Sequence, residues 1–134
     1  MKFSLNWLKR YVEIACGPEE LADRLTHVGW NCDGIDPAGD DVVLDLEITS
    51  NRGDCLSHLG MAREISARLG TPLRRPEAEL AEDARPVETV TSVEVHDPDL
   101  CPRYTARVIE GVKVGPSPAW MVKLLETVGL RSVS

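Results

Sequence analysis

The chain has 134 residues, of which 43% are hydrophobic and 28% are charged, and its formal net charge at pH 7 is −7. This length allows one ordinary domain, or one small domain and part of another. The acidic balance argues against an autonomous nucleic-acid binder. No apolar run approaches the roughly 20 residues that span a bilayer, so we expect a cytoplasmic protein with no membrane partner.

The negative charge is concentrated in one segment. Between Pro76 and Asp99 there are eight acidic residues and the single basic residue Arg85, so this segment carries a charge of −7 and the remainder of the chain is neutral. The four cysteines form no Cys-x-x-Cys pair, and a cytoplasmic chain with a sufficient core has little need of disulfides. We therefore expect free thiols and no metal site.

Two helices are predicted before residue 30. Ser4 can cap a helix that runs to about Val12 and that has apolar residues on one side. The string GPEE at residues 17–20 is typical of a second helix start, because proline is tolerated in the first turn and acids complement the positive helix end. Gly29 is expected to end this second helix.

A hairpin and a third helix are predicted next. Residues 30–35 can form a strand, and a turn over residues 37–41 leads into a second strand at residues 42–48, where apolar and polar side chains alternate. Asp54 stands where a carboxylate can cap a helix that starts near Cys55, and Gly70 permits a left-handed end. The expected apolar stripe of this helix has Leu59 at its centre.

The remainder divides into a linker and a second unit. Residues 73–91 are acidic and proline-rich and show no sustained apolar period, as in a linker. Alternating side chains predict two strands, around residues 93–95 and 104–108, and Ser117 is expected to cap a helix that Gly129 closes. The predicted fold class is α+β: a winged-helix-like module with a β-hairpin over residues 1–72, then a partial second α+β unit over residues 92–134.

Four segments of the chain carry a family resemblance. They are MKFSLNWLKRYV, EELADRLTHVGWNCDGI, EITSNRGDCLSHLGMARE and CPRYTARVIEGVKVGPSPAWMVKLLETVGLR. In this order they resemble the N-terminal part of the bacterial phenylalanine–tRNA ligase beta subunit. In most members of that family a tRNA-binding barrel is inserted where this chain has only the turn of residues 37–41, so the resemblance implies a form that lacks this barrel.

The resemblance implies a structural and assembly role in an enzyme that uses ATP and magnesium to attach phenylalanine to its tRNA. In the family the adenylate-forming site belongs to the alpha subunit, so we expect no catalytic residue, cofactor or metal in this chain. The implied partners are the alpha subunit, the remaining beta-subunit modules and the tRNA. Residues 92–134 resemble only the start of the central editing-type module, and no editing residue is assigned to them.

An alternative stays open at this point. The order helix, helix, hairpin, helix is also found in stand-alone winged-helix modules that bind nucleic acid or regulate other proteins.

The last helix has an apolar stripe, which includes Leu124 and Leu125. This stripe must be covered by another apolar surface. We expect self-association of the isolated chain to provide this cover, and docking on the first module and mobility are the alternatives.

The candidate interaction residues lie in the turn before the third helix and in the linker. Asn51 suits a turn conformation, and Arg52 presents a planar fork that suits a carboxylate or a phosphate. We expect Arg52 to pair with Asp54, or with an acid of another element, and to fix the turn; contact with the rest of the subunit or with RNA is the alternative. Arg74 and Arg75 are expected to be solvated charges of the linker rather than RNA contacts.

Cys55 and His58 are the one pair that suggests catalysis. A thiolate at a helix start is stabilised by the helix and can act as a nucleophile beside a histidine base. The adjacent Asp54 adds negative charge, and no third orienting residue can be named. We therefore expect a structural role for both residues.

Overall fold

The computed structural model describes residues 1–133, which form two compact units. The first consists of residues 1–77 together with the segment from Pro116 onward, and the second of residues 78–115. The first unit contains nearly all the regular structure, listed here in chain order: β1 (Lys2–Ser4), α1 (Leu5–Leu8), α2 (Pro18–Thr26), β2 (Cys32–Ala38), β3 (Asp41–Leu46), the 3₁₀ turn Gly53–Cys55, α3 (His58–Leu69) and α4 (Ala119–Thr127). These elements confirm the predicted α+β class.

The three strands form one antiparallel sheet in the order β1, β3, β2. Leu44 in the central strand pairs with Phe3 of β1 and with Ile35 of β2. Ala38 pairs with Asp41, so the turn between β2 and β3 consists of Gly39 and Asp40 alone. Gly39 has a φ of 67°, which a residue without Cβ adopts at little cost. The hairpin predicted from the sequence is confirmed.

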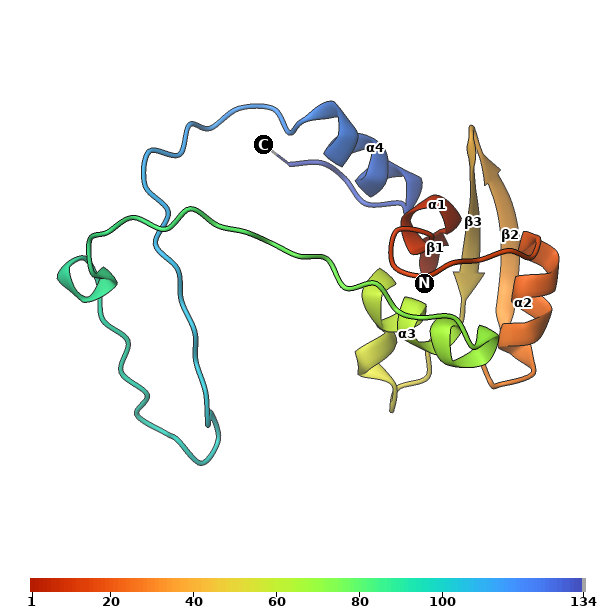
Figure 1. Ribbon diagram of the computed structural model, residues 1–134, viewed down its shortest axis with the longest axis horizontal. Helices are drawn as coiled ribbons and strands as arrows, with labels where there is room; N and C mark the ends of the chain where they lie inside the picture. The colour runs from red at the N-terminus through yellow and green to blue at the C-terminus, as the bar shows by residue number, and fades with distance from the viewer. Residues whose placement is uncertain (134) are drawn as a thin grey trace. The chain divides into compact units, whose positions relative to one another are not determined.

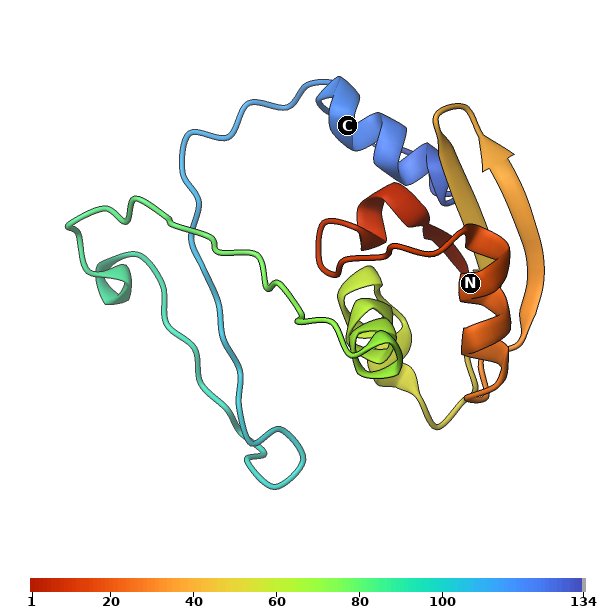
Figure 2. The same ribbon diagram turned by 45° about the vertical axis from the view of Figure 1, so that its right-hand side comes forward.

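The helices of the first unit pack on this sheet and on one another. Figures 1 and 2 both show α1 beside α3 on the same side of the sheet, while α2 contacts both β2 and β3. The fully buried side chains that join these layers are Phe3, Leu8, Val12, Leu21, Leu25, Leu44, Leu46, Cys55, Met61 and Ile65. The first unit therefore has a mainly aliphatic core of its own.

Helix α1 is capped as predicted, although it ends earlier than predicted. The Ser4 hydroxyl accepts a hydrogen bond from the backbone N–H of Trp7 at 3.0 Å and donates one to the Asp41 carboxylate at 2.5 Å. Only Leu5–Leu8 are α-helical, because Val12 leaves the helix to form an antiparallel bridge with Leu73. A long-range pairing thus replaces the last turn of helix, about four residues, that the local periodicity predicted.

The prediction that Asp54 caps α3 is wrong. The cap is Ser57, whose hydroxyl accepts from the backbone N–H of Gly60 at 3.0 Å, and residues 53–55 form a separate 3₁₀ turn. The predicted apolar stripe is confirmed at Ala62 and Ile65, which are fully buried. Its centre is wrong, because Leu59 is 37% exposed and Met61 is buried in its place. The predicted helix end is confirmed, since Gly70 has a φ of 70°.

The predicted strands at residues 93–95 and 104–108 are not formed. In the second unit the structure assigns one 3₁₀ turn, Val87–Thr89, and no strand. An isolated strand pair buries too little apolar surface to hold itself together, and here the alternating side chains of Val93, Tyr104 and Val108 are all exposed. Arg85 with Glu110 and Arg107 with Glu82 form ion pairs within this unit.

Helix α4 belongs to the first unit. Its predicted cap, Ser117, is wrong, because the helix begins after Pro118 with no side-chain cap. Leu124 and Leu125 are half-buried, and Lys123 forms an ion pair of 2.8 Å with Asp40. This is the docking that the sequence left open beside self-association. Among residues 1–133, no helix has the length and apolar character needed to cross a membrane.

Candidate functional site

The polar cluster predicted around Arg52 is an ion-pair network at the start of α3. Nε of Arg52 lies 3.0 Å from Oδ1 of Asp54, and its Nη2 lies 2.6 Å from Oε1 of Glu64. Nη2 of Arg63 reaches the other Asp54 oxygen at 2.5 Å. The guanidinium carbon of Arg52 also lies 4.8 Å from the ring centroid of Trp30, within the range of a cation–π contact. One arginine thus links the turn, α3 and the segment before β2.

The network explains the charge state of its members. Hydrogen bonds from Arg52 are the main cause that holds the pKa of Asp54 well below its usual range. Burial is the main cause that raises the pKa of the Cys55 thiol to about 11, and the hydrogen bond from its Sγ to Asp54 adds to this effect. Asp54 is therefore ionised and Cys55 protonated near neutral pH, which is the reverse of what a nucleophilic cysteine needs.

The ligand atoms of Asp54, Cys55 and Glu64 lie within 4.8 Å of one another, a spacing that a metal ion could bridge. Both carboxylates already pair with arginines, and the thiol is protonated at neutral pH. A divalent cation would have to replace the guanidinium of Arg52 as their partner. The donor set therefore suits a closed ion-pair network better than a metal centre.

His58 is a buried structural residue, and sequence reasoning did not find its partner. It is 7% exposed, and its Nε2 accepts a hydrogen bond of 3.0 Å from the backbone N–H of Ser4. Its ring stacks on Trp7 with centroids 4.0 Å apart and meets the edge of Phe3 at 5.2 Å. Burial lowers the pKa of His58 to about 4, so the ring is neutral and Nε2 is free to accept.

These contacts separate the two residues that suggested catalysis. Nε2 of His58 is occupied by the Ser4 N–H, and Cys55 bonds to Asp54 and Arg52 instead. Neither residue has the free, activated partner that a nucleophile and a general base require. The pair therefore offers no catalytic constellation.

The other candidate residues lie apart from this cluster. Asn51 is exposed in the turn, and its side chain makes no hydrogen bond within residues 1–133. Arg74 is fixed on the first unit: its backbone N–H donates to the carbonyl of Tyr11 at 2.6 Å, and its guanidinium donates to the carbonyl of Lys9 at 2.8 Å. Arg75 is exposed. Arg74 is thus more ordered than a solvated linker charge.

The fold and the cluster around Arg52 define a small α+β module. The polar contacts of this cluster connect elements of the module to one another.

The comparison with models of protein families gave no match. A phenylalanine–tRNA ligase beta subunit from Rhodopirellula baltica is 48% identical over 134 residues, all of this chain and 20% of that relative. Subunits of the same name from Syntrophus aciditrophicus and Geobacter sulfurreducens are 56% and 50% identical over 94 residues, which are 70% of this chain and 12% of each relative.

The resemblance seen in the sequence is therefore confirmed: the chain is homologous to a short part of the phenylalanine–tRNA ligase beta subunits. It spans a fifth or less of the length of these curated relatives. The match over all 134 residues includes the second unit as well as the packed first unit.

Proposed function

We propose that this chain acts as a structural and assembly module within a phenylalanine–tRNA ligase beta subunit, in the enzyme that joins phenylalanine to its tRNA. The observation that carries the proposal is the 48% identity over the whole chain to a subunit of that name. The aliphatic core of the first unit, the ion pair of Arg52 with Glu64 and the hydrogen bond between His58 and Ser4 support a structural role.

The chemistry of the complete enzyme is assigned to residues outside this chain. Activation of an amino acid for attachment to tRNA uses ATP and magnesium, and the resemblance puts that site in the alpha subunit. The proposed partners are the alpha subunit, the remaining beta-subunit modules and, in the complete enzyme, the tRNA. The proposed location is the cytoplasm. The ranges 1–72, 73–91 and 92–134 remain the proposed modules of the longer subunit.

We also propose that Asn51, Arg52 and Asp54 fix the turn that leads into α3. The bidentate contact of Arg52 with Asp54 and its second contact with Glu64 support this role. The side chain of Asn51, which is exposed in this turn, is then available to another part of the subunit.

Co-purification tests the assembly role. The tagged chain is expressed with the alpha subunit and with the remainder of the beta subunit as a separate polypeptide, and the expected result is a complex of all three. The control is Leu44→Asp, which places a charge at a fully buried position of the central strand and should abolish incorporation. Failure of the unaltered chain to join the complex would refute the assembly role.

Pyrophosphate exchange tests the prediction that this chain does not activate phenylalanine by itself. With phenylalanine and ATP, the three-part complex is expected to exchange pyrophosphate, whereas the 134-residue chain by itself is expected to show no turnover. Exchange by the purified chain at a rate that survives removal of contaminating ligase would contradict the proposal.

A further inference from the structure

Two segments that are far apart in the sequence lie side by side at one edge of the first unit. Val12 and Leu73 form an antiparallel bridge, the backbone N–H of Arg74 donates to the carbonyl of Tyr11, and the Thr71 hydroxyl donates to the carbonyl of Glu13 at 3.3 Å. The start of the linker is therefore anchored along the chain that follows α1.

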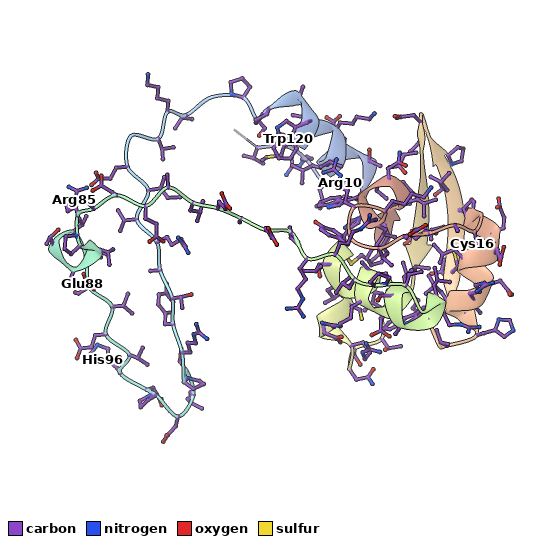
Figure 3. All side chains as sticks on the ribbon, viewed as in Figure 1. Arg10, Cys16, Arg85, Glu88, His96 and Trp120 are labelled. Carbon is purple, nitrogen blue, oxygen red and sulfur yellow. The ribbon has the colours of Figure 1, made fainter. Side chains whose placement is uncertain are left out.

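This pairing gathers four cations, which we call the basic patch: Lys9, Arg10, Arg74 and Arg75. Arg74 is the fixed centre, because its Nη2 donates to the Lys9 carbonyl at 2.8 Å. Arg10 lies between Lys9 and Tyr11 in the chain and Arg75 follows Arg74, so the two hydrogen bonds that Arg74 donates to Lys9 and Tyr11 bring the two basic segments together. Figure 3 shows Arg10 beside α1. All four side chains belong to exposed residues.

The basic patch differs from most other cations of residues 1–77. Arg68 is a further cation with no ion pair within residues 1–133, and it stands alone and donates to the Arg24 carbonyl at 3.2 Å. Lys2, Arg24, Arg52 and Arg63 each form an ion pair with a carboxylate, whereas no ion pair within residues 1–133 involves any member of the patch. This contrast is marked in a chain whose first 77 residues contain nine Lys and Arg against thirteen Asp and Glu. The patch thus holds four positive charges that have no carboxylate partner within residues 1–133.

We propose that the basic patch contacts the phosphate backbone of RNA. The proposal rests on the proposed function, in which tRNA is a partner of the complete enzyme. Three of the four cations are arginines, whose planar fork matches phosphate oxygens. At about 0.1 M salt, charges more than about 10 Å from the patch are largely screened, so the net charge of the whole chain does not determine the electrostatic field at the patch. Contacts of this kind are independent of base sequence.

The first experiment measures the affinity of the 134-residue chain for a short fluorescent hairpin RNA as salt is varied. Four phosphate contacts predict a slope of log affinity against log salt of about −3.6, which weakens binding on the order of 100-fold between about 50 and 200 mM salt. Binding should therefore be measurable at low salt and fade at physiological salt. An unaltered chain that does not bind this RNA at low salt would overturn the proposal.

The second experiment compares two variants with equal net charge. Arg10→Gln combined with Arg75→Gln removes two patch cations whose side chains make no hydrogen bond within the described chain. Arg103→Gln combined with Lys113→Gln is the control in the second unit. The patch variant should lower the salt slope by about 2 and weaken binding about 10-fold or more at low salt, whereas the control should keep the slope. Equal losses in both variants would show general charge attraction and overturn the proposal.

A third experiment distinguishes RNA from an acidic protein as the partner of the patch. It also tests the patch proposal independently of the assembly role. A polyglutamate peptide that binds the patch more tightly than the RNA would favour an acidic protein surface and overturn the proposal. The same patch variant is expected to join the three-part ligase complex as well as the unaltered chain does. If the patch variant joins the complex and binds the RNA as tightly as the unaltered chain, only the proposed RNA contact of the patch is refuted. Lost assembly of the unaltered chain refutes the proposed function.

Discussion

Titration of His58 should couple the stability of the first unit to pH. In the folded chain its pKa is about 4, against an ordinary value of 6.5, because the ring is buried against Trp7 and Phe3. The unfolded chain therefore takes up the proton at a higher pH than the folded chain does. The contribution of His58 is complete above about pH 6.5, declines as the pH falls, and is lost by about pH 4.

The magnitude follows from the two pKa values. At 1.36 kcal/mol per pKa unit, the difference between 6.5 and about 4 corresponds to about 3 kcal/mol of unfolding free energy. The physical event is specific: protonation of Nε2 removes the acceptor for the Ser4 N–H and places a charge between two aromatic rings. A loss of this size is a substantial part of the stability of a small domain.

The assay is urea unfolding followed by far-ultraviolet circular dichroism at a series of pH values between about 7 and 4.5. His58→Gln removes the titration and keeps a side-chain oxygen that can accept from Ser4. The matched control is His27→Gln, at an exposed position at the end of α2. The unaltered chain and the control should lose stability more steeply than His58→Gln over this range. Parallel curves for all three proteins would refute the reasoning.

Three further predictions concern helix α3, and each is measured as the free energy of urea unfolding. Met61→Ala should destabilise the chain by about 2–5 kcal/mol because Met61 is fully buried, whereas Leu59→Ala at the exposed face should stay within about 0.5 kcal/mol. Gly60→Ala should destabilise by about 1–3 kcal/mol despite the better helix propensity of alanine, because its Cβ would overlap the Asp54 carbonyl oxygen. Ser57→Ala should cost about 0.5–2 kcal/mol as the loss of a cap. A larger loss of stability in Leu59→Ala than in Met61→Ala would contradict the observed helix face. Unchanged stability in Gly60→Ala would contradict the close approach to Asp54, and unchanged stability in Ser57→Ala would contradict the cap.

Features set by neighbouring residues were predictable from the sequence. Ser4 caps α1, Pro18 starts α2, and Gly70 ends α3 in the left-handed conformation, each by a rule that needs only a few adjacent residues. The hairpin was predictable for the same reason, because its strands are separated by a short polar turn. Local chemistry is sufficient where no distant group competes for the same atoms.

The start of α3 was not predictable by the same rules. Asp54 and Ser57 are both good caps, and either choice gives an apolar stripe at helical spacing. The choice is made by Arg52 and Arg63, which take the Asp54 carboxylate and leave the cap to Ser57. His58 shows the same limit, since nothing near it in the sequence points to the Ser4 backbone, 54 residues away.

The predicted strands of the second unit failed for a related physical reason. Alternation at Val93 and Val95 describes which side chains would share a face, but a strand also needs neighbours that satisfy its backbone groups and cover that face. Within residues 78–115 no such layer is present. The alternation of apolar and polar side chains therefore indicates that this segment is compatible with strands, but residues 78–115 do not form them.

The turn between β2 and β3 offers a physical reason why the module can hold either a short turn or an inserted domain. The groups that fix α1 come mainly from the start of β3, because Asp41 accepts from the Ser4 hydroxyl and from the backbone N–H of Asn6. The turn itself contributes one backbone acceptor to α1, the carbonyl of Asp40, which receives a hydrogen bond from the Asn6 side-chain amide at 3.0 Å. A Cβ added at Gly39 would meet no atom within 4 Å, so there is open space on that side of the turn. A domain inserted at Gly39 would leave Asp41, the strand pairing and the core in place, because loops with few contacts tolerate insertions. The barrel that the family resemblance implies for longer members can therefore be absent without loss of the scaffold.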